Sequence, residues 1–239
     1  MNSAHGLEKC LTFINCHLQT PPRLRWDAPV ASGRAITISR QAGSGGHAIA
    51  EKLADHLKAQ EPEDGQPWAV FDRNLVERVL ADNHLPARLA RFMPEDRVSQ
   101  ISDTMDELFG LHPPCWILVR KTSETILHLA ELGHVILIGR GANIITRKLP
   151  HAFHVRLVGS LDKRMKRLQE LNRINPKEAL RLAAREDLAR RRYLKQFFGK
   201  DIDDPLLYHL VINTDLVSVD EAARMVALAM APKPLAMAS

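Results

Sequence analysis

Residues 35–50, with the sequence AITISRQAGSGGHAIA, restrict what this chain can fold into more than any other stretch. Residues 35–38 form an alternating apolar run, a glycine cluster follows at 43–46, and helical spacing begins at Ala48. A strand, a glycine turn and a helix in this order suit an anion, because glycines let the backbone approach closely and the first amides of a helix are unpaired. The stretch predicts a nucleotide-binding turn; the alternative is a turn that only joins a strand to a helix.

The turn differs from a standard phosphate-binding loop at the positions that carry chemical groups. The Walker A pattern is G-x-x-x-x-G-K-[ST], with a lysine that reaches the β- and γ-phosphates and a hydroxyl that binds Mg²⁺. When Gly45 is aligned with the second glycine, Arg40 takes the first glycine position. Gly46 then stands at the lysine position and His47 at the hydroxyl position. The backbone cradle is therefore predicted without its two usual side chains.

The composition is that of a globular protein. The 239 residues suffice for one α/β domain with an insertion or for two small domains. A formal net charge of +5 suits an anionic ligand such as a nucleotide, with nucleic acid or acidic lipid as alternatives. The three cysteines lack CxxC spacing, which predicts reduced thiols and a cytoplasmic location. No apolar run reaches the roughly 18 residues of a membrane span.

Four more apolar segments predict strands, and helical patterns separate them. The strands are expected at 68–71, 135–138, 153–158 and 210–213. Helices are expected from the glycine turn to about residue 58, at 117–132 and at 219–231. The last helix is introduced by the capping pair Ser218 and Glu221. Five strands that alternate with helices imply a three-layer α/β fold of P-loop type, with a five-stranded parallel sheet.

Charged residues follow two of these strands, at the edge where α/β sheets bind ligands. Asp72 directly follows the segment 68–71, and its alternative role is an N-cap for a helix that begins at Asn74. Arg140 lies between two glycines after the segment 135–138, where its forked guanidinium can meet a phosphate. The alternative for Arg140 is a salt bridge with a nearby acid. Both residues are candidates for binding substrate.

The segments outside these elements divide the chain into a core and its additions. We expect an amphipathic helix and linker at 1–33, a core domain at 34–231 and a tail at 232–239. The first helix packs on the core by default; a protein partner, self-association or a membrane surface are its alternatives.

Two helical regions are expected to cover the sheet. A proline-interrupted insertion at about 73–114 suits a part that covers the substrate. A strongly basic region at about 162–195, broken by Asn175-Pro176, predicts two helices that form a lid over a polyphosphate.

Four stretches together resemble one family. They are ITISRQAGSGGHAIAEKLA, FDRNLVERV, LIGRGANII and REDLARRRYLKQFFGKDIDDPLLYHLVINTD, within residues 35–231. Each alone is weak evidence, whereas their joint presence is specific. In these stretches the chain resembles the cytidylate kinase-like family, relatives of bacterial CMP kinase. The resemblance implies a nucleoside monophosphate kinase fold with an ATP-binding loop, a helical monophosphate-binding insertion and a helical lid.

The resemblance also implies roles for individual residues. Those expected to contact the ATP phosphates are Gly43, Ser44, Gly45, Gly46, His47 and Ala48. Arg140 corresponds to the arginine of a GRD motif that meets the acceptor, which makes Asp72 and Arg140 the substrate-binding pair. The implied lid residues are Arg164, Arg185, Asp187 and Arg190, and the implied catalytic residues are Arg140, Arg164 and Arg190. Phosphoryl transfer needs positioning and charge neutralisation, so arginines and the Mg²⁺ that accompanies ATP would carry it.

The chain departs from the family pattern at several charged positions. Besides Gly46 and His47 in the loop, the GRD motif ends in Gly141, and the D-x-E-R pattern of the lid has Ala189 in place of the glutamate. A histidine with an ordinary pKa is only partly charged at neutral pH, so His47 is a weaker cation than a lysine.

Two functions follow from this combination. The first is ATP-dependent phosphoryl transfer to a nucleoside monophosphate, with CMP or dCMP as the first choice. The second is a catalytically weak or inactive nucleotide-binding regulator, in which the N-terminal helix transmits lid closure to a partner. Nucleic-acid binding through the lid is disfavoured, because its aromatic residues, Tyr193, Phe197 and Phe198, are expected to anchor the core.

Overall fold

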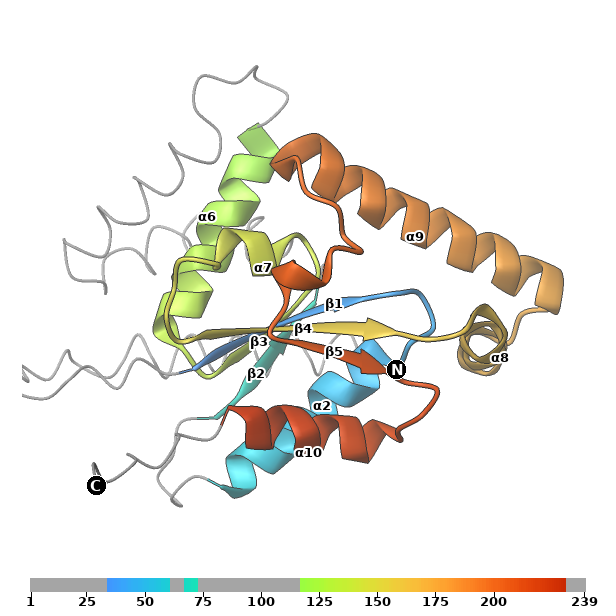
Figure 1. Ribbon diagram of the computed structural model, residues 1–239, viewed down its shortest axis with the longest axis horizontal. Coiled ribbons are helices and arrows are strands. Elements are labelled where there is room, and N and C mark those ends of the chain that lie inside the picture. The colour runs from blue at the N-terminus through green and yellow to red at the C-terminus, as the bar shows by residue number, and fades with distance from the viewer. Residues whose placement is uncertain (1–33, 61–66, 73–116, 231–239) are drawn as a thin grey trace, which may run out of the picture.

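The computed structural model describes residues 34–60, 67–72 and 117–230 (Figure 1). The N-terminal helix expected within 1–33, the insertion at 73–114 and the tail at 232–239 lie outside the described residues. The described part contains the sheet, the glycine turn and the basic region at 162–195.

A five-stranded parallel sheet forms the centre of the molecule, which confirms the predicted fold class. Its strands are β1 (Ala35–Arg40), β2 (Ala69–Phe71), β3 (Val135–Ile138), β4 (Ala152–Val158) and β5 (Leu210–Asn213). Their order is β2-β3-β1-β4-β5, so β1 lies in the middle of the sheet between β3 and β4. The glycine turn that follows β1 therefore opens at the middle of the carboxyl edge.

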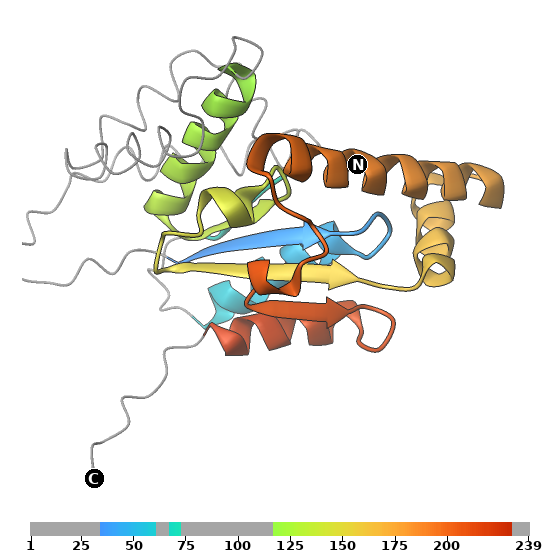
Figure 2. The same ribbon diagram turned by 45° about the horizontal axis from the view of Figure 1, so that its top comes forward.

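Helices cover both faces of the sheet (Figures 1 and 2). One face is covered by α2 (Gly46–Ala59) and α10 (Val219–Ala229), and the other by α6 (Ile117–Leu132) and α7 (Ala142–Ile145). Successive side chains of a strand point to opposite faces, so Ile136 packs with α2 and α10 while Leu137 packs with α6. Burial on both faces explains why β3 is continuously apolar.

The basic region forms two helices, α8 (Leu161–Asn172) and α9 (Pro176–Phe198); α8 lies beyond the carboxyl edge of the sheet, and α9 runs from there back over the sheet toward α6 (Figure 1). Asn175 caps α9 in a capping box with Glu178, and Pro176 is its first residue. The aromatic residues at the end of α9, Tyr193, Phe197 and Phe198, pack against the core as expected. Within the described ranges, no helix is long and apolar enough to cross a membrane.

Two histidines meet at the beginning of β5. The buried His154 of β4 shares a hydrogen bond of 2.9 Å between its Nδ1 and the Thr37 hydroxyl, and its backbone N–H donates to His209 Nδ1 at 2.9 Å. Burial, aided by the neighbouring His209, lowers the pKa of His154 to about 4. The folded protein therefore holds His154 neutral.

This arrangement predicts acid sensitivity. An unfolded histidine binds its proton near pH 6.5, so the contribution of His154 is complete above that pH and is lost as pH falls toward 4. We expect urea unfolding to show a loss of about 2 kcal/mol between pH 7 and pH 5. A His154→Asn variant should lack most of this loss; an equal loss in both proteins would contradict the assignment.

Candidate active site

A cavity of about 520 Å³ lies at the carboxyl edge of the sheet, beside α9. Its lining comes from the end of β1, the residue after β2, the turn after β3 and the inner side of α9. The lining residues are Thr37, Ile38, Ser39, Arg40, Asp72, Gly139, Arg140, Gly141, Ala142, Asn143, Glu186, Ala189, Arg190, Tyr193, Leu194 and Ile202. The volume is in the usual range for a site that binds a small molecule.

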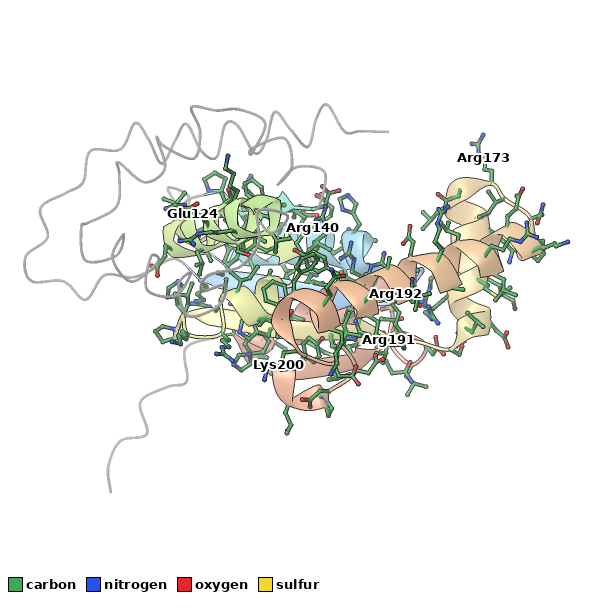
Figure 3. All side chains as sticks on the ribbon, turned by 90° about the horizontal axis from the view of Figure 1, so that it is seen from above. Glu124, Arg140, Arg173, Arg191, Arg192 and Lys200 are labelled. Carbon is green, nitrogen blue, oxygen red and sulfur yellow. The ribbon has the colours of Figure 1, made fainter. Side chains whose placement is uncertain are left out.

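Three of the predicted site residues, Asp72, Arg140 and Arg190, line this cavity together. Arg140 has a left-handed backbone (φ 55°), and its guanidinium carbon lies 5.7 Å from the centre of the Tyr193 ring. A cation over an aromatic face is held by the ring quadrupole, so Tyr193 orients Arg140 from α9. Figure 3 shows Arg140 near α9, whereas Arg173 lies at the outer tip of the α8–α9 pair.

Arg40, which was not among the predicted site residues, also lines the cavity. Burial is the main cause that lowers its pKa, to about 10, and the neighbouring Arg190 lowers it further. The guanidinium therefore remains protonated at neutral pH. With Arg140 and Arg190 it places three cationic groups in the cavity, against the carboxylates of Asp72 and Glu186. Guanidinium groups arranged in this way suit a phosphate.

The glycine turn has the shape of an anion-binding loop. Gly43 and Gly45 have φ values of 77° and 82°, and a Cβ on Gly43 would lie 2.3 Å from the carbonyl oxygen of Arg164. Among the described residues, the amides of Gly45, Gly46, His47 and Ala48 have no hydrogen-bond partner. These amides belong to the N-cap and the first turn of α2, where the helix dipole favours an anion.

The α8–α9 pair braces this loop from the other side. Buried Arg164 donates from Nη1 to the Ala42 carbonyl at 3.0 Å and to Asp187 at 2.7 Å. Asp187 in turn accepts the Ala42 N–H at 2.7 Å. Ala42 also packs with Leu168 and Ala183. The α8–α9 pair thus fixes the loop through both polar and apolar contacts.

The structure does not bring all the predicted residues into one cavity. Arg164 and Asp187 do not line it, because they bond to the loop and to each other. Arg185 is exposed on α9 and does not line it either. The predicted ATP-binding residues 43–48 adjoin the cavity without lining it, since the lining from this part of the chain ends at Arg40, the last residue of β1. The cavity and the loop are therefore neighbouring parts of one edge.

Sequence reasoning missed Arg40, Glu186 and the contact of Tyr193 with Arg140. For Arg40 a signal existed, because a large cation at the first glycine position of a Walker A pattern needs a reason. For Glu186 and Tyr193 no local signal existed, since both lie on a helix far along the chain. Among the described residues no cluster of three or more His, Cys, Asp or Glu could hold a metal ion by itself.

A central strand that leads into a glycine loop, with a basic cavity and a helical pair at the same edge, defines the class of P-loop kinase folds. The chain belongs to the cytidylate kinase-like family, whose family model matches residues 35–216.

Two relatives agree with this assignment, and one solved structure agrees with the fold. The chain is 30% identical over 193 residues to a cytidylate kinase of Pyrobaculum aerophilum, covering 80% of this chain and 89% of the relative. It is 26% identical over 180 residues to a cytidylate kinase of Pyrococcus horikoshii, covering 75% and 79% of the two chains. An uncharacterised protein from Eubacterium ventriosum has a similar fold, with a TM-score of 0.63, 24% identity and coverage of 82% and 97%.

The contact between Gly43 and α8 yields a prediction for stability. Gly43→Ala should cost roughly 2 kcal/mol more than Gly199→Ala, because both have positive φ but only the Cβ at position 43 would meet backbone atoms. Gly199, at the end of α9, has nothing within 4 Å of its Cβ direction and serves as the matched control. Urea unfolding of both variants measures the difference, and equal costs would mean that the loop is not held against Arg164.

Proposed function

We propose that this protein transfers a phosphoryl group from ATP to a nucleoside monophosphate, with CMP or dCMP as the first acceptor to test. The observation that carries the proposal is the convergence of Arg40, Arg140 and Arg190 on one cavity, beside a glycine turn whose amides at 45–48 have no partner among the described residues. Negative charge accumulates on the phosphoryl group during its transfer. Guanidinium groups and backbone amides stabilise this charge by their position and their electrostatic attraction, without covalent chemistry.

In this proposal the glycine loop and the cavity bind different substrates. The amides of residues 45–48 hold the ATP phosphates, and the cavity holds the acceptor nucleotide between Asp72 and Arg140. Arg190, aligned by its salt bridges to Glu186 and Asp187, faces the cavity from the α9 side. Arg164 and Asp187 position the loop instead of contacting the phosphates.

Mg²⁺ enters with ATP in this proposal and supplies further neutralisation of the phosphate charge. Magnesium is commonly held by substrate phosphates, waters and one or two carboxylates, so it does not require a cage built by the protein. Asp72 and Glu186 are the cavity carboxylates that could contribute.

The acceptor is chosen from similarity. The relatives named above are cytidylate kinases, at 30% and 26% identity. The cavity at the end of β2 and β3 has room for a small nucleotide next to Arg140.

A second candidate is a nucleotide-binding regulator with weak or no turnover. Gly46 and His47 favour it, since the usual lysine and hydroxyl are absent and the His47 side chain is 66% exposed beside Glu51.

A coupled assay with ATP, Mg²⁺ and a panel of nucleoside monophosphates separates these functions. Turnover above background, highest with CMP or dCMP, is expected for the kinase. ATP binding without turnover on any acceptor would favour the regulator. Strong, salt-sensitive binding to oligonucleotides in the absence of both would reject the two in favour of a nucleic-acid role.

Arg140 should act on the acceptor more than on ATP. We expect Arg140→Lys to raise the KM for the monophosphate about tenfold or more, with little change in the KM for ATP, because lysine cannot reproduce the guanidinium fork. Arg224→Gln, which removes an exposed arginine paired with Asp220 on α10, is the matched control and should behave as wild type. A larger effect on ATP than on the acceptor would refute the assigned role.

A further inference from the structure

We propose that Arg40 supplies the phosphate-binding charge that a Walker A lysine supplies elsewhere, so that arginine and glycine have exchanged places across the loop. The inference rests on the proposed function and names the cation of the same site. In the alignment to the Walker A pattern, Arg40 occupies the first glycine position and Gly46 the lysine position. The geometry indicates that these two substitutions are linked.

Gly46 makes room for the stem of Arg40. A Cβ on Gly46 would lie 3.1 Å from Arg40 Cγ, 3.4 Å from its Cβ and 3.6 Å from its Cδ. The arginine stem therefore passes over the first residue of α2, where a lysine side chain would begin. A longer side chain at position 46 would force the Arg40 stem to shift, which explains why the residue opposite Arg40 is glycine.

Gly139 makes room for the charged end. A Cβ there would lie 2.0 Å from Arg40 Nη1 and 3.2 Å from its guanidinium carbon, and Gly139 has a φ of 83°. The guanidinium thus rests on the backbone at the end of β3, in the cavity that Arg140 and Arg190 also line. Arg40 delivers its charge from the strand side of the loop, to the edge at which the loop amides open.

The charge of Arg40 lacks a direct partner in the described part of the chain. No salt bridge or hydrogen bond links its guanidinium to another described residue. Glu186 and Asp72 act on it only electrostatically, and Arg190 and Arg140 oppose them. A desolvated cation without a partner is unfavourable, and an anionic ligand in the cavity would offset this cost.

A double-mutant cycle tests the exchange directly. Wild type, Arg40→Gly, Gly46→Lys and the double variant are compared by equilibrium binding of ATP and of inorganic tripolyphosphate. Arg40→Gly should weaken both about tenfold or more, as expected for loss of a charge-assisted contact. Gly46→Lys should give no gain while Arg40 is present, because the two stems meet. Gly46→Lys should restore most of the binding in the Arg40→Gly background, since the lysine at the first position of α2 then supplies the missing positive charge.

Three further variants separate charge from packing. Arg40→Gln keeps most of the stem and should lose binding, whereas Arg40→Lys keeps the point charge that a Walker A lysine supplies and should retain binding within about threefold. Arg224→Gln is the control for removal of an arginine elsewhere. Thermal unfolding of each variant shows that it is folded, and Arg40→Gln provides the result if Arg40→Gly does not fold.

The outcomes are distinguishable. Unchanged binding in folded Arg40→Gly and Arg40→Gln, with wild type binding ATP, overturns the role of Arg40 and leaves the proposed function intact. Equal losses in Arg40→Lys and Arg40→Gln assign the effect to packing and overturn it as well. An equal gain from Gly46→Lys in both backgrounds rejects the exchange. Wild type that binds neither ATP nor tripolyphosphate overturns the proposed function and this inference together.

Discussion

The parallel pairing of β1 with β3 and β4 is the constraint on which the site depends. All five strands end at one edge, so the glycine turn after β1, Asp72 after β2 and Arg140 after β3 gather there. The register pairs Ile38 with Ile138 and places Arg40 beside the turn that carries Gly139. A shift of one residue would turn Ile36 and Ile38 away from α2 and α10, the helices against which they pack, so the packing of the sheet on these helices fixes the register.

The loop depends in turn on helices that lie more than a hundred residues later in the chain. Arg164 and Asp187 bond to the carbonyl and the amide of Ala42, and the left-handed Gly43 lies against the backbone of α8. Asp187 also holds Arg190, which lines the cavity. One carboxylate therefore links the shape of the loop to the position of a cavity arginine. A displacement of the α8–α9 pair would therefore change both the shape of the loop and the position of Arg190.

Much of the architecture could be predicted because its signals are local. Alternation and unbroken apolar runs marked all five strands within one or two residues, and the Ser218–Glu221 capping box and Asn175-Pro176 marked two helix starts. The short helix α7 was missed, since the glycines around Arg140 indicate a loop and four residues carry too little periodicity. Arg40 was noticed as an anomaly in the loop pattern, although its neighbours could not be known.

The sequence by itself determined the α/β class, the glycine turn after the first strand and the charged residues at strand ends, because these depend on side-chain periodicity and local backbone preference. Only the tertiary structure decided the strand order, the seat of Arg40 between Gly46 and Gly139, and the diversion of Arg164 and Asp187 to the loop. Those features join segments that are distant in the chain. Such contacts depend on packing and desolvation, which the local spacing of residue types does not reveal.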